Sequence, residues 1–231
     1  MVEKKRIISK SQANLFLDCP YKWKKCYIDK IRSEPSPAQE RGIRIHSKIE
    51  EFYKKVKIID NVLSIDFDEE LVGFTNHEEN RLPLCKDNDG NFNEKYFKPL
   101  FQELVMSNEE LGLKGIVDAV FINPADDGVV VIDWKTGKYY PDKFDDYRFE
   151  LAVYAELLKS TGNVEDVKYI GIYFVDQDET FFEELQPKSI EKMYATMDKV
   201  REGIKSGQYP PKKNKWCYFC QFRKDCPLYK K

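Results

Sequence analysis

The fold is decided by the stretch Val129-Val130-Val131-Ile132-Asp133-Trp134-Lys135-Thr136-Gly137. Its four apolar, β-branched residues lead to a Thr-Gly turn signal, a pattern that predicts a buried strand. Because side chains alternate along a strand, Asp133 and Lys135 share one face while Trp134 points to the other. An acid and a lysine are costly to bury at the end of a strand, so the pair is either a structural ion pair or part of a functional site.

The chain on either side of this strand alternates between helical and strand periodicity. Apolar residues three or four apart predict helices over 39–57, 146–160 and 187–205. Shorter alternating runs predict strands over 101–105, 111–122, 169–175 and 180–185.

This order of elements predicts an α/β fold, with a three-stranded meander inside a mixed β-sheet that helices flank. We expect a single domain over residues 1–231, in which the acidic, irregular residues 60–99 form an insertion. No apolar run is long enough to cross a membrane, and the N-terminus lacks the pattern of a secretory signal. We therefore expect a cytoplasmic protein.

Residues 7–31 predict a helix that opens at Ser9 and Ser11 and is interrupted at Cys19-Pro20. Beyond the interruption, aromatic residues alternate with lysines over 21–27. That alternation is typical of a nucleic-acid surface and, to the same degree, of an amphipathic helix packed on a core. The sequence leaves both interpretations open.

The net charge of −2 conceals a segregation of charge along the chain. Residues 1–32 hold nine Lys or Arg against three acids, and residues 205–231 hold eight against one. The two ends therefore carry +6 and +7, which leaves −15 for the middle. Basic ends around an acidic middle indicate a polyanion-binding surface beside a metal-binding centre, provided that the ends meet in space.

The cysteines also gather at the two ends. Cys217, Cys220 and Cys226 form a tight cluster near the C-terminus, Cys19 and Cys26 lie near the N-terminus, and Cys85 is alone. In a reducing cytosol this spacing points to metal before disulfide. Three clustered thiolates need a fourth to complete a tetrahedral site or an iron–sulfur cube, and that donor must be distant in the sequence.

Acidic residues are expected on three consecutive strands: Glu103, then Asp118, then Asp133. Converging carboxylates repel one another unless a cation lies among them, and oxygen ligands favour Mg²⁺ or Mn²⁺. An imidazole from His46 shifts the preference toward Mn²⁺. With the positive charge of Lys135 beside such an ion, the group is suited to phosphodiester hydrolysis.

These residues follow the order of a known signature. Gly115-x-x-Asp118 followed by Asp133-Trp134-Lys135 resembles the PD-(D/E)XK nuclease superfamily. Arg41-Gly42-x-x-x-His46 and Glu150-x-x-x-Tyr154 narrow the resemblance to its RecB-like branch. The resemblance implies a restriction-endonuclease-like core in which His46, Asp118, Asp133 and the backbone carbonyl of Trp134 bind the catalytic metal, Mn²⁺ or Mg²⁺. It also implies that Lys135 positions the attacking water. Glu103 would either bind a second metal ion or contact the ligands of the first.

Two positions of the helix over 146–160 complete this comparison. Tyr154 matches a tyrosine of the family, whereas Glu150 stands where the family usually has glutamine. The extra negative charge of Glu150 should repel a phosphate unless it binds metal or pairs with a neighbour such as Arg148.

The cysteines carry a further resemblance. Cys19 with Cys217, Cys220 and Cys226 is similar to the four-cysteine iron–sulfur clamp of AddB-type and CRISPR-associated RecB-like exonucleases. It implies a [4Fe–4S] cluster that joins residue 19 to residues 205–231, with Zn²⁺ as the alternative occupant. Cys26 is the rival fourth ligand, although Cys26 and Cys85 are better explained as small buried hydrophobes.

The resemblance as a whole implies a divalent-metal-dependent DNA exonuclease that acts on single strands or free ends. The settings it implies are recombination, repair, phage DNA processing and CRISPR adaptation, with recombination or CRISPR adaptation proteins as partners. The alternative is a nuclease-fold DNA-binding or recombination accessory protein with weak or no cleavage. The intact Asp133-x-Lys135 pair argues against that alternative, and Glu150 argues for it.

Overall fold

A mixed sheet organises the chain in the computed structural model, which describes residues 5–31, 34–140 and 143–229. Among these residues, one sheet contains six strands and a separate hairpin contains two. The strands of the sheet are β1 (Ile8–Ser9), β4 (Phe101–Asn108), β5 (Leu113–Ile122), β6 (Val129–Lys135), β7 (Tyr169–Phe174) and β8 (Glu179–Glu184). The hairpin consists of β2 (Lys57–Ile59) and β3 (Val62–Ser64).

The sheet is built around the predicted meander. Strands β4, β5 and β6 pair in antiparallel order, with Ala119 opposite Ile132 and Leu104 opposite Val117. The chain then crosses over through α6 (Phe144–Ser160) to β7, which pairs with β6 in parallel, and β8 returns antiparallel to β7. The predicted mixed sheet flanked by helices is confirmed.

The N-terminal segment differs from the predicted helix in its first residues. Ile8 and Ser9 form β1, which pairs in parallel with β5 through Leu113 and Lys114. Helix α1 (Lys10–Asp18) follows at once, and the Ser9 hydroxyl caps it by accepting from the N–H of Gln12 at 3.2 Å. The serine is therefore the predicted helix-start signal, but the apolar residue before it completes a sheet edge.

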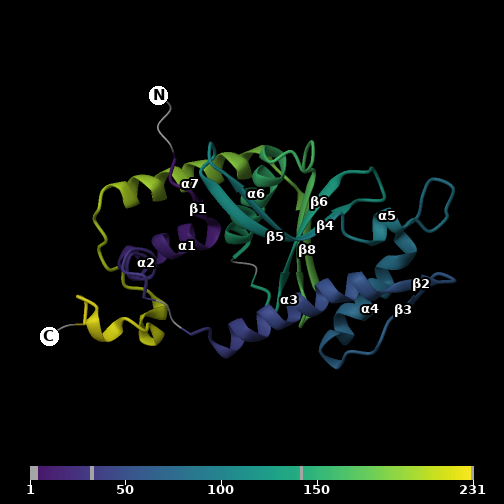
Figure 1. Cartoon of the computed structure of the whole chain (residues 1–231), viewed down its shortest axis with the longest axis horizontal. Coiled ribbons are helices and arrows are strands. Elements are labelled where there is room, and N and C mark those ends of the chain that lie inside the picture. The colour runs from purple at the N-terminus through teal and green to yellow at the C-terminus, as the bar shows by residue number, and fades with distance from the viewer. Residues whose placement is uncertain (1–4, 32–33, 141–142, 230–231) are drawn as a thin grey trace.

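Helices cover both faces of the sheet (Figure 1). On one face α1, α6 and α7 (Pro187–Lys205) share a core with the sheet that includes Phe16, Leu157 and Met197. On the other face α3 (Pro37–Lys55), α4 (Val72–Arg81) and α5 (Glu94–Phe97) enclose a second core. Trp134 belongs to this second core. No helix among the described residues is long and apolar enough to span a membrane.

Residues 60–99 are more ordered than their composition suggests. They contain β3, α4, α5 and the short 3-10 turns η1 (Glu69–Leu71) and η2 (Leu82–Leu84). Phe74 and Phe97 from this segment are fully buried beneath the sheet. The apolar residues of 60–99 are widely separated among acidic ones. The segment therefore lacks the regular spacing by which a helix is predicted from sequence.

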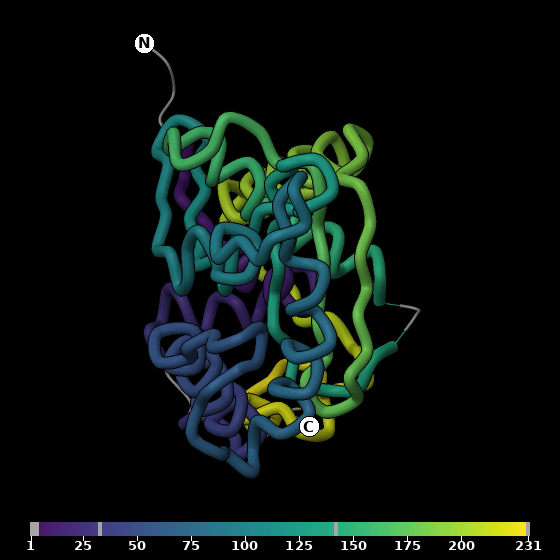
Figure 2. Tube along the Cα trace, turned by 90° about the vertical axis from the view of Figure 1, so that its right-hand side faces the viewer, coloured from purple at the N-terminus to yellow at the C-terminus, as the bar shows by residue number. Residues whose placement is uncertain are grey.

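The two basic ends of the chain lie side by side. Helix α2 (Pro20–Tyr27) follows the break at Cys19-Pro20, and the C-terminal tail packs against it through the turns η4 (Lys215–Phe219) and η5 (Arg223–Asp225). The side chain of Asn214 donates to the Asp18 carbonyl at 3.1 Å, and the Tyr21 hydroxyl donates to the Asp225 carbonyl at 3.0 Å. Figures 1 and 2 show the yellow tail returning to the end of the molecule where the N-terminal helices lie.

The aromatic residues of α2 differ in burial, so each of the two interpretations that the sequence left open keeps some support. Trp23 is fully buried, with its ring 5.6 Å from that of Phe16 and stacked 5.8 Å from that of Tyr209. Trp23 is therefore a core residue, as expected of an amphipathic helix, whereas Tyr27 is 38% exposed and the lysines of α2 stay at the surface.

Candidate active site

The site begins where β5 and β6 separate. Their paired residues run from Ile122 opposite Val129 to Ala119 opposite Ile132 and stop there. The next residue of β5, Asp118, instead uses its carboxylate to accept from the N–H of Trp134 at 2.8 Å. A side chain thus replaces the next ladder bond, which holds Asp118 at the opening between the strands.

Glu103 lies opposite Asp118 in the register of β4 and β5, between the pairs Gln102–Ala119 and Leu104–Val117. Its φ is +45°, a left-handed conformation in the middle of a strand. A residue with a Cβ is strained there by about 1–3 kcal/mol, and such strain collects at functional sites. The backbone conformation therefore marks Glu103 as a candidate independently of its charge.

His46 approaches these two acids from α3. Its Nδ1 lies 3.5 Å from Oδ2 of Asp118 and 3.6 Å from Oε1 of Glu103. Its Nε2 lies 2.9 Å from the carbonyl oxygen of Trp134, which fixes the plane of the ring. Burial lowers the pKa of His46, but the contacts with Asp118 and Glu103 outweigh burial and raise it to about 10. The imidazole therefore carries a proton that balances the two carboxylates when no other cation is present.

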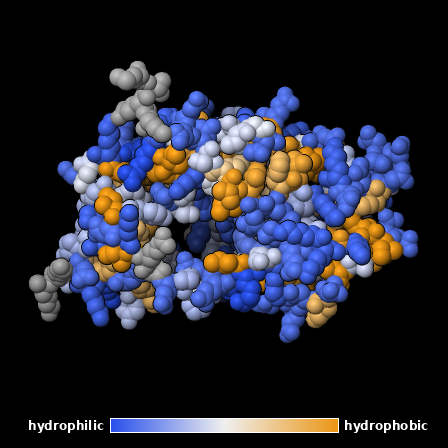
Figure 3. All heavy atoms as spheres, in the orientation of Figure 1, coloured by the Kyte–Doolittle hydropathy of each residue, from blue (hydrophilic) through white to orange (hydrophobic). Residues whose placement is uncertain are grey.

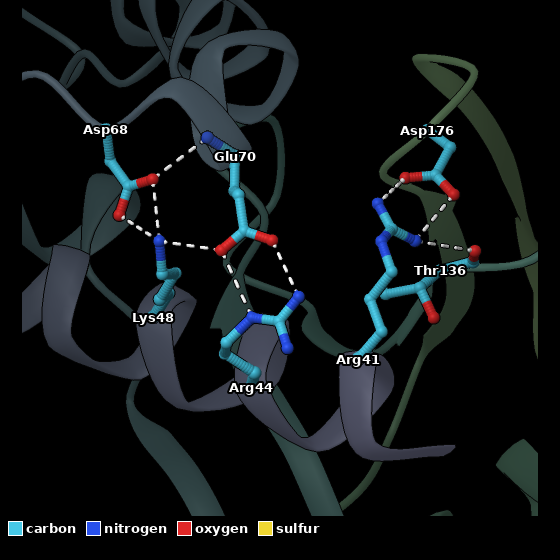
Figure 4. Close-up of polar contacts among 7 residues, drawn as sticks. All are labelled: Arg41, Arg44, Lys48, Asp68, Glu70, Thr136 and Asp176. Atoms are coloured by element: carbon cyan, nitrogen blue, oxygen red, sulfur yellow. Dashed lines mark hydrogen bonds and ion pairs between the residues drawn. The ribbon is translucent and has the colours of Figure 1, made fainter. Parts of the chain in front are cut away.

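Ion pairs on the outer face of α3 hold this helix in place (Figure 4). Arg41 forms a two-pronged pair with Asp176, at 2.6 and 2.9 Å, and donates to the carbonyl of Thr136 at 3.3 Å. One and two turns further along, Arg44 and Lys48 bind the residues before α4, with Arg44 on Glu70 at 2.8 Å and Lys48 on Asp68 at 2.7 Å. The helix that carries His46 is thus tied both to the chain just after Lys135 and to the 60–99 segment.

Asp133 and Lys135 share a face of β6, as the alternation predicted. The Lys135 ammonium lies 2.5 Å from Oδ2 of Asp133 and 3.2 Å from Oε2 of Glu150 on α6. Burial, and after it the carboxylate of Glu150, raises the pKa of Asp133 to about 8 against the opposing effect of Lys135. The two flanking carboxylates outweigh burial and raise the pKa of Lys135, so this amine remains charged.

Glu150 is buried between two lysines. Besides Lys135 it pairs with Lys10, the first residue of α1. The Tyr154 hydroxyl also donates to the Glu150 carboxylate, at 3.3 Å. Burial alone raises the pKa of Glu150, but the two ammonium groups outweigh it and lower that pKa below its usual value. The negative charge that departs from the family pattern is therefore neutralised within the site.

The neighbour that neutralises Glu150 is not the one suggested by the sequence. Arg148 turns away and binds Glu183 with two contacts, at 2.6 and 2.7 Å. Lys10 takes its place, because β1 pairs with β5 and thereby directs the start of α1 toward α6. Sequence reasoning missed Lys10, and the only signal that pointed to it was the unexplained charge at position 150.

Two of the predicted ligands of the catalytic metal, His46 and Asp118, form a compact donor group with Glu103. The ligand atoms of His46, Glu103 and Asp118 all lie within 4.8 Å of one another. Ligands of Mg²⁺, at bonds of about 2.1 Å, stand roughly 3–4 Å apart, so this group fits a divalent cation after small side-chain shifts. Asp133 lies next to this group but faces Lys135, and the Trp134 carbonyl faces the ring of His46. Their assignment as metal ligands stays a prediction.

An open groove of about 580 Å³ leads to this donor group. Its walls are the middle of α3 and parts of β4 and β5. Figure 3 shows a hydrophilic hollow on the same side of the molecule, between the part formed by α1, α2 and the tail and the part formed by α3 and the sheet. The groove is lined by Gly42, Ile43, His46, Ser47, Glu50, Glu103, Val105 and Ile116.

The four cysteines of the predicted cluster line a second cavity, between α1, α2 and the tail. Cys19 is there together with Cys217, Cys220 and Cys226, whereas Cys26 is not among the lining residues. Backbone N–H groups point at two of the sulfurs, from Lys212 to Cys19 at 3.5 Å and from Asn214 to Cys217 at 3.3 Å. Hydrogen bonds from backbone N–H groups to ligating sulfurs are a common feature of metal–thiolate sites. Cys85 is buried elsewhere, beside Arg81 and the Tyr96 carbonyl.

Comparisons with known proteins agree with this geometry. A sequence model of the PD-(D/E)XK nuclease superfamily matches residues 7–227. An ATP-dependent helicase/nuclease of Streptococcus pyogenes, found in serotype M5 and M49 strains, is 32% identical over 114 residues. That match covers 45% of this chain and 9% of the relative, so the chain aligns with only a small part of it.

A crystal structure from Eubacterium rectale, of a protein provisionally described as an exonuclease, has the same fold. The two structures superpose with a TM-score of 0.55 over 98% of this chain and 90% of the other, at 14% sequence identity. Members of the matched superfamily use divalent metals, and the donor group of His46, Glu103 and Asp118 offers such a site here. Since the superfamily match extends over nearly the whole chain, this protein belongs to the PD-(D/E)XK nuclease superfamily.

Proposed function

We propose that the protein is a divalent-metal-dependent DNA exonuclease that acts on single strands or free ends. The observation that carries the proposal is the donor group of His46, Glu103 and Asp118 with the charged Lys135 close by. The carboxylate and imidazole donors fit Mn²⁺ or Mg²⁺, and Asp133 and the Trp134 carbonyl are proposed to complete the shell. The protein names of the matched relatives, a helicase/nuclease and an exonuclease, support the same reaction class.

His46, Glu103 and Asp118 would hold a divalent cation, which would supply polarisation of a phosphoryl oxygen and activation of a water molecule. The residues of the chain provide the remaining functions. Lys135 holds the attacking water and offsets the charge that develops on the phosphate. Glu150 and Tyr154 keep the Lys135 side chain directed at the opening between β5 and β6. The Trp134 carbonyl keeps the His46 ring facing the two acids.

The proposed substrate follows from the distribution of charge. The described parts of the two ends are both rich in Lys and Arg and pack against each other, which supports one basic surface for a polyanion. The acidic donor group alone would repel a phosphodiester, and it accepts one only together with its cation. Recombination and CRISPR adaptation proteins stay as predicted partners.

The function is tested by incubating end-labelled single-stranded DNA with the purified protein and Mn²⁺, Mg²⁺ or EDTA. We expect metal-dependent release of short products from linear DNA and little attack on circular single strands, because an exonuclease needs an end. The Lys135→Ala variant, purified in parallel, controls for a contaminating nuclease. Absence of metal-dependent cleavage on every DNA form would overturn the proposal. Rapid cleavage of circular single strands would show that the protein is an endonuclease and not an exonuclease.

We propose further that Cys19, Cys217, Cys220 and Cys226 hold a [4Fe–4S] cluster. A zinc ion with bonds of about 2.3 Å to four sulfurs draws them to about 3.8 Å from one another. Among the described residues no three cysteine sulfurs lie within 4.8 Å of one another, so these side chains would have to move to bind a zinc ion. The N–H donors at Cys19 and Cys217 support thiolate ligation. The cluster would tie residue 19 to residue 217 and so restrict the unfolded chain.

Protein purified without oxygen is expected to be brown, with an iron–thiolate absorption band and about four irons per chain. The Cys19→Ser variant should lose most of the iron, whereas Cys26→Ser should retain it. A colourless protein with one zinc per chain would contradict the cluster. Loss of iron from the Cys26→Ser variant, and not from Cys19→Ser, would show that Cys26 is the fourth ligand in place of Cys19.

A further inference from the structure

The C-terminal tail presents an unusual group of exposed aromatic rings. Trp216, Tyr218 and Phe219 are 54%, 72% and 79% exposed, within four consecutive residues of η4. The other two tryptophans, Trp23 and Trp134, are 0% and 4% exposed. Elsewhere in the described chain, exposed aromatic residues stand singly. Large exposed apolar groups in a cluster mark a binding surface.

The rings are held by an anchored turn. The side chain of Asn214 caps η4 by accepting from the N–H of Trp216 at 2.9 Å, and the same side chain donates to the Asp18 carbonyl. Lys212 donates to the Leu17 carbonyl at 2.8 Å. These bonds fix the turn against the end of α1, so the rings project from a structured base and little conformational entropy is lost when they bind.

The charge around the rings is mainly positive, although η5 ends in the exposed acid Asp225. Residues 212–224 contain five Lys or Arg and no Asp or Glu. Lys215 lies over the ring of Trp216 at 5.3 Å, and Arg223 lies over the ring of Tyr218 at 5.2 Å. Within the described part of the chain, none of the five forms an ion pair with an acid, whereas the cations of α3 are all paired with acids. These positive charges are available to an anionic partner.

We infer that Trp216, Tyr218 and Phe219 form a stacking platform for the bases of single-stranded DNA. Unpaired bases offer flat apolar faces joined by phosphates, and a platform of aromatic rings between cations is complementary to both parts. A duplex hides its base faces, and an apolar protein partner leaves the cations without counter-charges. The inference rests on DNA as the proposed substrate and adds a second contact, outside the metal site, that selects unpaired nucleotides.

The position of the platform suits a strand that runs to the metal site. The tail packs on α1 and α2, which form one side of the hollow seen in Figure 3, and α3 with His46 lies across it. The inference therefore includes a path for the strand from the tail to the groove beside Glu103, which is lined by α3, β4 and β5. The exposed rings of the tail thus stand beside α2, whose Trp23 is buried in the core.

Tryptophan fluorescence reports this contact directly, because Trp216 is the one exposed indole of the three. We would titrate the full chain in EDTA, which prevents cleavage, with oligothymidylate of about ten nucleotides. Stacking is expected to quench the red-shifted emission of Trp216. An abasic oligonucleotide of the same length should bind at least about tenfold more weakly and leave the emission unchanged, since it keeps the phosphates but lacks the bases.

Two variants separate the rings from the charges. Trp216→Phe should lose the signal and keep most of the affinity, measured by anisotropy of a labelled oligonucleotide. The triple variant Trp216→Ser/Tyr218→Ser/Phe219→Ser keeps every positive charge and should bind at least about tenfold more weakly. Phe67→Ser, which removes an equally exposed ring (84%) in the 60–99 segment, is the matched control and should bind as the wild type does. Circular dichroism and metal content should be the same in all variants.

The outcomes distinguish this inference from the nuclease proposal. Wild-type affinity in the triple variant, equal binding of the abasic strand, or an unchanged Trp216 emission would each overturn the platform. Self-association that the triple variant abolishes would assign the rings to a second copy of the chain and would overturn it as well. Quenching by oligothymidylate without any metal-dependent cleavage would uphold the platform and reject the nuclease.

Discussion

Substituting Lys10 with methionine is expected to lower the rate of metal-dependent cleavage by about a hundredfold, although Lys10 is distant from the signature residues in the sequence. Lys10 neutralises Glu150, which in turn holds Lys135. Without Lys10 the buried carboxylate of Glu150 has Lys135 as its only counter-charge and draws this ammonium away from Asp133. Displacement of a positioning group by about 1 Å costs a rate factor of about 10², so kcat should fall while KM changes little.

The double variant Lys10→Met/Glu150→Gln is the decisive companion. A neutral glutamine needs no counter-charge and can still accept a hydrogen bond from Lys135, so activity should recover to within a fewfold of the wild type. Glu150→Gln alone should be intermediate, because it leaves Lys10 without its partner. Steady-state kinetics of the four proteins measure the coupling energy between Lys10 and Glu150. For residues in contact this energy is about 0.5–3 kcal/mol. Independent effects of the two substitutions would show that Lys10 acts on stability alone.

Replacing Glu103 with glycine is expected to move stability and activity in opposite directions. Glycine adopts a φ of +45° without strain, so the free energy of unfolding should rise by about 1 kcal/mol in urea titrations with EDTA present. The same change removes one of the three grouped donors, so cleavage with Mn²⁺ should fall by at least about a hundredfold. The result would show that the strand stores strain in order to aim this carboxylate.

Two further variants separate the backbone from the charge. Glu103→Gln keeps the strained backbone and should lose activity without any gain in stability. Asp60→Gly, at a φ of +50° in the exposed β2–β3 turn, should raise stability and leave cleavage unchanged. A Glu103→Gly protein that is less stable than the wild type would mean that the ion pair with His46 outweighs the strain, which would contradict this account.

The agreement between sequence and structure is best for elements with a clear period. Helix α7 runs from Pro187 to Lys205, the predicted limits, and β6 begins at Val129 as predicted. Both combine a regular apolar pattern with a strong boundary signal. The limits of such elements are therefore set by residues that are near one another in the sequence. β1 was missed, because two residues hold no period and pair only when β5 is already in place.

The sequence by itself determined the mixed sheet with its meander, the shared face of Asp133 and Lys135, and the set of polar residues able to form a site. These features depend on side-chain alternation and on chemistry that each residue carries with it. Only the tertiary structure decided that His46, Glu103 and Asp118 form the compact donor group, that Lys10 rather than Arg148 neutralises Glu150, and that the exposed aromatic rings lie on the tail. Each of these depends on segments far apart in the chain, and their distance is set by packing of the whole sheet and its helices, which no local pattern encodes.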